Sequence, residues 1–191
     1  MSARSSRYVS RAGDKLAAAA EAFNVDFRDK TVLDIGSSTG GFTDYALQYG
    51  AKSVVAVDIG TDQLHPKLRA SDRIELHEKT DIFNFWPKIQ PNLIVIDVSF
   101  TSLQPILKYV KKRCSNNHNV VVLAMLKPQF EANPAELNNG VVKNSTIRRR
   151  IIKDFEQAIR SDYIICSKKD NTLAGLNGNV ERFYMLRPTY K

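Results

Sequence analysis

The sequence predicts an α/β fold with one mostly parallel, seven-stranded sheet, an antiparallel last strand and helices on both faces. Short apolar runs rich in β-branched residues recur seven times along the 191 residues, and each is typical of a buried strand. Helix-length or irregular stretches separate the first six runs, which favours parallel strands joined by crossovers. The last connection, residues 168–180, is rich in Gly and Asn and lacks helical periodicity, so it indicates a hairpin.

A leading helix is the first expected element. It falls within residues 8–24, because residues 10–24 are Ala-rich and place Leu16, Ala19, Ala20 and Phe23 at helical spacing. A sheet-and-helix core is expected over residues 30–188, and residues 1–191 are expected to form a single domain. Its strands are expected at residues 32–35, 54–58, 74–78, 93–97, 120–126, 163–167 and 182–186.

The clearest functional signal is the segment T-V-L-D-I-G-S-S-T-G-G, which starts at Thr31 and predicts a strand, a tight loop and a helix. In the dinucleotide fingerprint a central glycine admits a pyrophosphate, but Ser38 stands at that place here, so such a ligand is disfavoured. Asp58 ends the next strand, 22 positions after Gly36, and could accept both hydroxyl hydrogens of an adenosine ribose. Adenosine without phosphates suggests S-adenosylmethionine. Alternatively, the glycines only form a tight turn and Asp58 caps the next segment.

Charge and cysteine content limit the possible partners and compartments. The net charge of +8 and the isoelectric point near 9.5 favour a polyanion such as nucleic acid. Cys114 and Cys166 are far apart in the sequence and no apolar leader is found, so a cytoplasmic protein is expected. The longest apolar run, residues 120–126, is far shorter than the ~20 residues that cross a bilayer. The histidines are too scattered to predict a metal site.

Polar residues at strand ends are candidates for the chemistry, because ligands of open parallel sheets bind at the carboxyl ends of the strands. Asp97 follows L-I-V-I, Lys127 follows V-V-V-L-A-M-L and Glu181 begins the reversed strand, so one edge should carry all three. Lys15 of the leading helix could fold over that edge. Methylation of a ribose hydroxyl needs an oriented oxygen and a proton acceptor. Two neighbouring lysines favour a neutral amine on one of them, and the carboxylates would hold both.

Each of these residues also has a structural interpretation. Lysines are mostly exposed, so Lys15 could lie on the surface. Asp97 could cap the turn that follows it, and Glu181 could pair with a basic residue across a strand. Asp81, after the third strand, could contact an adenine amine or cap a helix. For Lys127 a structural role is harder to find, because burying an unpaired ammonium after an apolar run is costly.

Six ordered blocks of the sequence carry a family likeness. They are S-R-A-G-D-K-L at residues 10–16, D-I-G-S-S-T-G-G-F at 34–42, D-V-S-F at 97–100, L-K-P-Q-F-E at 126–131, N-G-V-V at 139–142 and G-N-V-E at 178–181. Together they resemble the hemolysin A (TlyA) type of FtsJ-like RNA methyltransferase. The expected strand plan also resembles the Rossmann-like sheet of class I methyltransferases.

The resemblance implies 2'-O-methylation of ribose in ribosomal RNA with S-adenosylmethionine as the methyl donor. It implies ribosomal RNA or ribosomal subunits as partners, and no membrane role is expected. Members of this family usually carry a small RNA-binding domain before the catalytic one, and no counterpart is expected here. The family's catalytic tetrad falls on Lys15, Asp97, Lys127 and Glu181. The expected cofactor contacts fall on Asp34, Gly36, Ser38, Gly40, Phe42, Asp58, Asp81 and Asp97.

Two other functions remain open at this point. The segment from Asp97 to Phe100 stands where base N-methyltransferases carry an Asp/Asn-Pro-Pro-aromatic motif, although this chain lacks the prolines. The chain could also be an RNA- or ribosome-binding module that keeps the fold without catalysis.

Overall fold

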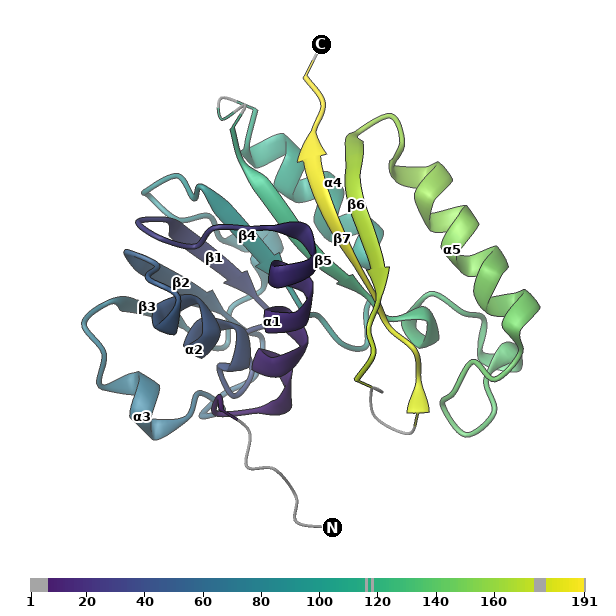
Figure 1. Ribbon diagram of the computed structural model, residues 1–191, viewed down its shortest axis with the longest axis horizontal. Coiled ribbons are helices and arrows are strands. Elements are labelled where there is room, and N and C mark those ends of the chain that lie inside the picture. The colour runs from purple at the N-terminus through teal and green to yellow at the C-terminus, as the bar shows by residue number, and fades with distance from the viewer. Residues whose placement is uncertain (1–6, 116, 118, 174–177, 191) are drawn as a thin grey trace. The chain divides into compact units, whose positions relative to one another are not determined.

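The computed structural model describes residues 7–115, 117, 119–173 and 178–190, and Figure 1 shows its elements. Its helices are α1 (Arg11–Phe23), α2 (Gly41–Gln48), α3 (Pro66–Arg69), α4 (Leu103–Arg113) and α5 (Ser145–Ile159), with the 3₁₀ turns η1 (Ile82–Asn84), η2 (Pro128–Phe130) and η3 (Pro134–Glu136). Its strands are β1 (Thr31–Ile35), β2 (Ser53–Val57), β3 (Ile74–His77), β4 (Leu93–Ile96), β5 (Val121–Leu126), β6 (Tyr163–Asp170) and β7 (Arg182–Pro188).

The predicted fold class is confirmed. The strands form a seven-stranded sheet in the order β3-β2-β1-β4-β5-β7-β6, with helices around it, and β7 runs antiparallel to β5 and to β6. The leading helix and all seven strands occur where the sequence predicts them. By its backbone contacts the chain divides into two compact units, Met1–Val95 and Ile96–Lys191.

In the first unit, β2 pairs in parallel with both β1 and β3. Helix α1 packs closely on α2, because Gly41 at the start of α2 carries no side chain. A Cβ atom on Gly41 would lie 2.8 Å from the backbone nitrogen of Gly13, and one on Gly13 would lie 2.5 Å from the Cβ of Tyr8. The block S-R-A-G-D-K-L therefore has a packing role in addition to carrying Lys15.

In the second unit, β7 lies between β5 and β6, and Arg182 at its start is opposite both Leu126 and Asp170. Strand β6 continues to Asp170, beyond the predicted end at residue 167, and its register shifts between Ile165 and Ser167. Helix α5 covers this hairpin, with the Phe155 ring 5.2 Å from the Tyr184 ring. Residues 174–177 of the predicted hairpin connection lie outside the described residues.

Two further features bear on the predictions. The connection between β3 and β4 contains only the short 3₁₀ turn η1, because Pro87 and Pro91 interrupt the segment.

Among the described residues, no helix combines the length and the apolar character that a bilayer crossing requires.

Candidate functional site

The glycine-rich loop after β1 takes backbone conformations that fit its sequence. Gly36 and Gly40 have φ angles of 82° and 92°, in the left-handed region that glycine adopts without strain. A Cβ atom on Gly40 would also collide with the side chains of Leu64 and Leu68. Ser38 is left-handed too, at φ 46°, which is unfavourable for a residue with a side chain. At Ser38 alone, therefore, the loop holds a conformation that its local sequence does not favour.

Asp58 supports this shape. One carboxylate oxygen accepts a hydrogen bond from the backbone N–H of Ser38 at 2.8 Å, and the other accepts from Gly60 at 2.7 Å. Each carboxylate oxygen has two lone-pair sites, so one site on each oxygen remains for a ribose hydroxyl. The structure thus gives Asp58 the predicted role of shaping the next segment and leaves it able to bind a diol.

The loop also fits a polar ligand at a second point. The Ser37 hydroxyl is buried and has no hydrogen-bond partner among the residues that the structure describes. A buried polar group without a partner costs roughly 1–3 kcal/mol, which a polar ligand atom would relieve. Ser37 lies directly between the predicted cofactor residues Gly36 and Ser38.

The other predicted cofactor residues of the first unit have structural contacts. Asp34 is fully buried and accepts a hydrogen bond from the Thr43 hydroxyl at 2.6 Å, which fastens the end of β1 to the first turn of α2. Phe42 is buried. Asp81 is exposed and caps η1 by accepting from the backbone N–H of Phe83 at 3.0 Å, as in the capping alternative. Contacts of these three residues with a cofactor stay predictions.

Glu78 is a site residue that the sequence analysis missed. Its carboxylate accepts from the backbone N–H groups of Asp62, Gln63 and Leu64 and from the Arg69 guanidinium at 2.6 Å. The hydrogen bond from Arg69, supported by the backbone donors, lowers the pKa of Glu78 to about 2. Glu78 thereby holds the loop that follows Asp58. No local signal predicts this, since its partners lie 9 to 16 residues earlier in the chain.

The second unit brings two predicted catalytic residues together. The Lys127 ammonium lies 2.7 Å from the Asp97 carboxylate and donates a hydrogen bond to the Ser99 hydroxyl at 2.8 Å. Both charged side chains are largely buried, at 12% and 16% exposure. The N-cap of α4 is Ser102, whose hydroxyl accepts from the backbone of Gln104. Asp97 therefore holds a cation at the end of β4, and the helix that follows has its own cap.

An exposed aromatic ring adjoins this ion pair. Phe100 is 91% exposed, its backbone is left-handed at φ 62°, and its ring lies 5.1 Å from that of Phe130. The Lys127 ammonium lies 5.9 Å from the Phe130 ring. Exposed aromatic rings are the usual platforms on which single-stranded nucleic acids stack their bases. The sequence analysis gave Phe100 no role of its own.

Glu131 fixes the loop that carries Asp97, Ser99 and Phe100. Its two carboxylate oxygens accept from the Ser102 hydroxyl and from the backbone N–H of Leu103, each at 2.7 Å. Negative charge at a helix N-terminus is favourable, so Glu131 anchors the start of α4. This role was also missed, because it joins residues about 28 positions apart.

The remaining tetrad residues are both buried. Glu181 is 3% exposed and accepts from the Asn171 side chain at 3.4 Å. It directly precedes Arg182, which is opposite Leu126, so the antiparallel register places Glu181 beside the end of β5, where Lys127 follows. Lys15 is 8% exposed, so the surface interpretation of this lysine is wrong. Its approach to the other three residues stays a prediction.

The chain is similar in sequence and fold to known proteins. The family of FtsJ-like methyltransferases matches residues 8–185 of the chain. The "23S rRNA (cytidine-2'-O)-methyltransferase TlyA" of Campylobacter jejuni is 37% identical over 180 residues, which are 93% of this chain and 70% of that protein. The "16S/23S rRNA (cytidine-2'-O)-methyltransferase TlyA" of Mycobacterium tuberculosis is 36% identical over 185 residues, 94% of this chain and 68% of that protein. A solved structure described as a "Putative hemolysin from Streptococcus thermophilus" gives a TM-score of 0.89 at 37% identity, covering 98% of this chain and 70% of that one.

Proposed function

Because the chain belongs to the family of FtsJ-like methyltransferases, we propose that it methylates the 2'-hydroxyl of a ribose in ribosomal RNA, with S-adenosylmethionine as the donor. The names of the two relatives make a cytidine the expected target. The observation that carries the proposal is the largely buried pair of Lys127 and Asp97 at the ends of β5 and β4. A lysine held in this way by a carboxylate and a hydroxyl is oriented for one reacting atom.

S-adenosylmethionine, when bound, supplies an electrophilic methyl group, and the residues of the chain must orient the ribose oxygen and manage its proton. Lys127 is the residue we assign to the proton: as a neutral amine, which the second lysine of the proposed tetrad would favour, it would accept the proton of the ribose hydroxyl. Asp97 and Ser99 fix the direction of its nitrogen. General-base assistance of this kind contributes roughly 10²- to 10⁴-fold, and in-line positioning supplies most of the rest. Lys15 and Glu181 complete the proposed tetrad.

We assign the methyl donor to the loop after β1. Gly36 and Gly40 would let the backbone of the loop approach the ligand, Ser38 would contact it from the middle of the loop, and Asp58 would accept the ribose hydroxyls. The Ser37 hydroxyl, which has no hydrogen-bond partner within the described part of the chain, supports a polar ligand at this place. Asp34 and Phe42 would support the loop, Asp81 would receive the adenine amine, and Asp97 would lie close to the reacting methyl.

On this proposal residues 1–191 act as one catalytic domain in the cytoplasm, where ribosomal RNA is found. We expect the exposed ring of Phe100, which neighbours the Phe130 ring as Lys127 does, to stack the base of the target nucleotide. Stacking would hold the nucleotide while its ribose is oriented.

Methyl transfer to RNA tests the proposal. The protein is incubated with tritiated S-adenosylmethionine and with free ribosomal RNA or assembled subunits, and the product is digested to nucleosides. Label on ribose is expected. Label on a base would instead identify a base N-methyltransferase. RNA binding without transfer to any of these substrates would favour the noncatalytic binding module.

A further inference from the structure

The positive charge of the chain belongs to one of its two units. Of the 28 Lys and Arg residues, 12 lie in Met1–Val95 and 16 in Ile96–Lys191, while the 20 Asp and Glu residues divide into 12 and 8. The first unit is therefore neutral, and the whole net charge of +8 lies in the second. A polyanionic partner is expected to contact the second unit.

Within that unit, helix α5 has a basic outer side. Arg149, Lys153 and Arg160 are exposed, and at 3.6 residues per turn their directions agree within about 40°. The side buried against the fold carries instead Ile151, Ile152, Phe155 and Ile159. With a rise of 1.5 Å per residue, the three cations span about 16 Å along the helix. We call Arg149, Lys153 and Arg160 the basic stripe.

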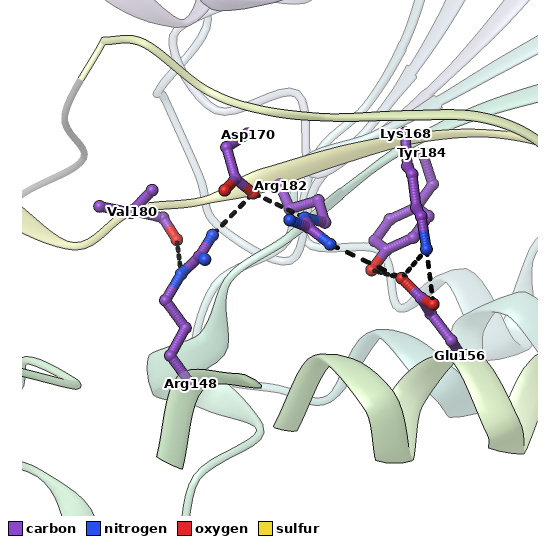
Figure 2. Close-up of polar contacts among 7 residues, drawn as sticks. All are labelled: Arg148, Glu156, Lys168, Asp170, Val180, Arg182 and Tyr184. Atoms are coloured by element: carbon purple, nitrogen blue, oxygen red, sulfur yellow. Dashed lines mark hydrogen bonds and ion pairs between the residues drawn. The ribbon is translucent and has the colours of Figure 1, made fainter. Parts of the chain in front are cut away.

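The acidic residues on and near α5 pair with cations that do not belong to the basic stripe, as Figure 2 shows for Glu156 and Asp170. Asp170 on β6 pairs with Arg148 at 2.7 Å and with Arg182 at 2.6 Å. Glu156 pairs with Lys168 at 2.8 Å and accepts from the Tyr184 hydroxyl at 3.0 Å. These contacts attach α5 firmly to the β6–β7 hairpin. The other acidic residue of the helix, Asp154, pairs with Arg150 at 3.1 Å.

The positive charges of the basic stripe are consequently not balanced by acidic residues that the structure describes. None of its three members forms an ion pair with a residue that the structure describes, and Arg149 bonds only to Ser145 of its own helix. Like charges four residues apart, as at Arg149 and Lys153, repel and weaken a helix. Such an arrangement gains nothing for folding, but it is well suited to a chain of phosphates.

We propose that the basic stripe of α5 is a docking surface for the sugar–phosphate backbone of RNA. The inference rests on the proposed function and names where the RNA is held outside the reacting site. Long cationic side chains on a rigid helix bind phosphates and release condensed counterions. They supply affinity and orientation without reading bases, because no aromatic or amide side chain belongs to the stripe.

A matched pair of variants tests this surface. One replaces Arg149, Lys153 and Arg160 with Gln, and the other replaces Lys52, Lys67 and Lys88, three exposed lysines of the first unit, with Gln. Both lose three positive charges, so both have the same net charge, and Gln is compatible with helix. Binding of fluorescently labelled ribosomal RNA fragments is measured between about 50 and 200 mM salt, together with methyl transfer.

The stripe variant should bind RNA on the order of tenfold more weakly, and the slope of log K against log salt should decrease in magnitude by about 2. Its KM for RNA should rise while kcat and S-adenosylmethionine binding stay unchanged, and the control triple should match the wild type. Equal weakening of both triples would overturn the proposal, because net charge alone would then explain binding.

Further outcomes separate this surface from the proposed function. A stripe variant that binds and methylates free RNA normally but fails on assembled subunits would overturn the RNA surface in favour of contact with a ribosomal protein. If the wild type binds RNA through the stripe but transfers no methyl group, the docking surface is supported and the proposed function is contradicted. If the wild type methylates RNA and the stripe variant binds and methylates RNA equally well, only the docking surface is contradicted.

Discussion

The two units of the chain use their carboxylates differently. In the first unit, Asp58 and Glu78 accept hydrogen bonds from backbone N–H groups and so shape loops, although Glu78 also holds Arg69. In the second unit, Asp97, Glu156 and Asp170 hold lysine and arginine side chains, and Glu131 shapes a loop as the first unit's carboxylates do. The neutral unit thus presents a shaped backbone, which suits a small nucleoside ligand, and the basic unit presents oriented cations, which suit RNA and its reacting hydroxyl.

Replacing Lys127 should have the largest effect of any single change and should act on chemistry alone. Lys127→Met is expected to lower methyl transfer by about 10²- to 10⁴-fold, since it removes the proposed proton acceptor. S-adenosylmethionine binding by calorimetry should persist, because all of its proposed residues except Asp97 lie in the first unit. Transfer at more than a tenth of the wild-type rate would contradict the assignment.

Lys143→Met is the matched control for this substitution. Lys143 is an exposed lysine of the same unit, so its replacement removes an equal charge. It should transfer methyl groups like the wild type. A loss at both positions would assign the effect to charge rather than to the buried ion pair.

A change at Asp58 should show the reverse pattern. Asp58→Ala removes two hydrogen bonds to the loop backbone and the proposed acceptor of the ribose hydroxyls. Because hydrogen bonds to charged groups contribute about 1.5–3 kcal/mol, the Kd for S-adenosylmethionine should rise about 10- to 100-fold. RNA binding in a mobility-shift assay should stay unchanged. Asp72→Ala, at an exposed position of the same unit, should leave both affinities intact.

Much of this arrangement can be predicted from the sequence because it depends on local patterns. Apolar runs predict the strands, and the rule for strand ends brings Asp97 to Lys127, which the structure places 2.7 Å apart. The resemblance to a known family predicts which reaction is catalysed and which residues take part in it. The strand boundaries are less accurate, as at β6, because pairing with β7 decides where that strand ends.

The missed residues depend on contacts that no local pattern contains. Glu131 holds the start of α4 across 28 residues, and Asp44 accepts from the backbone of Val9 across 35 residues. Phe100 follows a loop conformation that its own side chain disfavours. Such side chains can be assigned only once the tertiary structure brings their partners together.

A substitution at Glu131 tests whether the reaction depends on the position of the loop that carries Asp97 and Phe100. Glu131→Ala removes both hydrogen bonds at the start of α4 and should lower kcat about tenfold through misplacement of Asp97 and Phe100. The Kd for S-adenosylmethionine should not change. Glu136→Ala, which removes a half-buried carboxylate paired with Arg150, is the control and should keep kcat. An unchanged kcat in Glu131→Ala would show that the loop holds its shape without this contact.

Glu78 should produce the smallest effect, one on acid stability. Its pKa is about 2 in the fold against an ordinary value of 4.5, because Arg69 and three backbone N–H groups favour the ionised form. The unfolded chain therefore binds more protons between these values, so the stabilisation is complete above pH 4.5 and is lost as the pH falls towards about 2. Thermal unfolding should show Glu78→Gln below the wild type near neutral pH and converging with it at low pH. Glu21→Gln, at an exposed position of α1, should follow the wild-type curve throughout. If the gap between Glu78→Gln and the wild type were constant with pH, ionisation of Glu78 would not be what secures the loop behind Asp58.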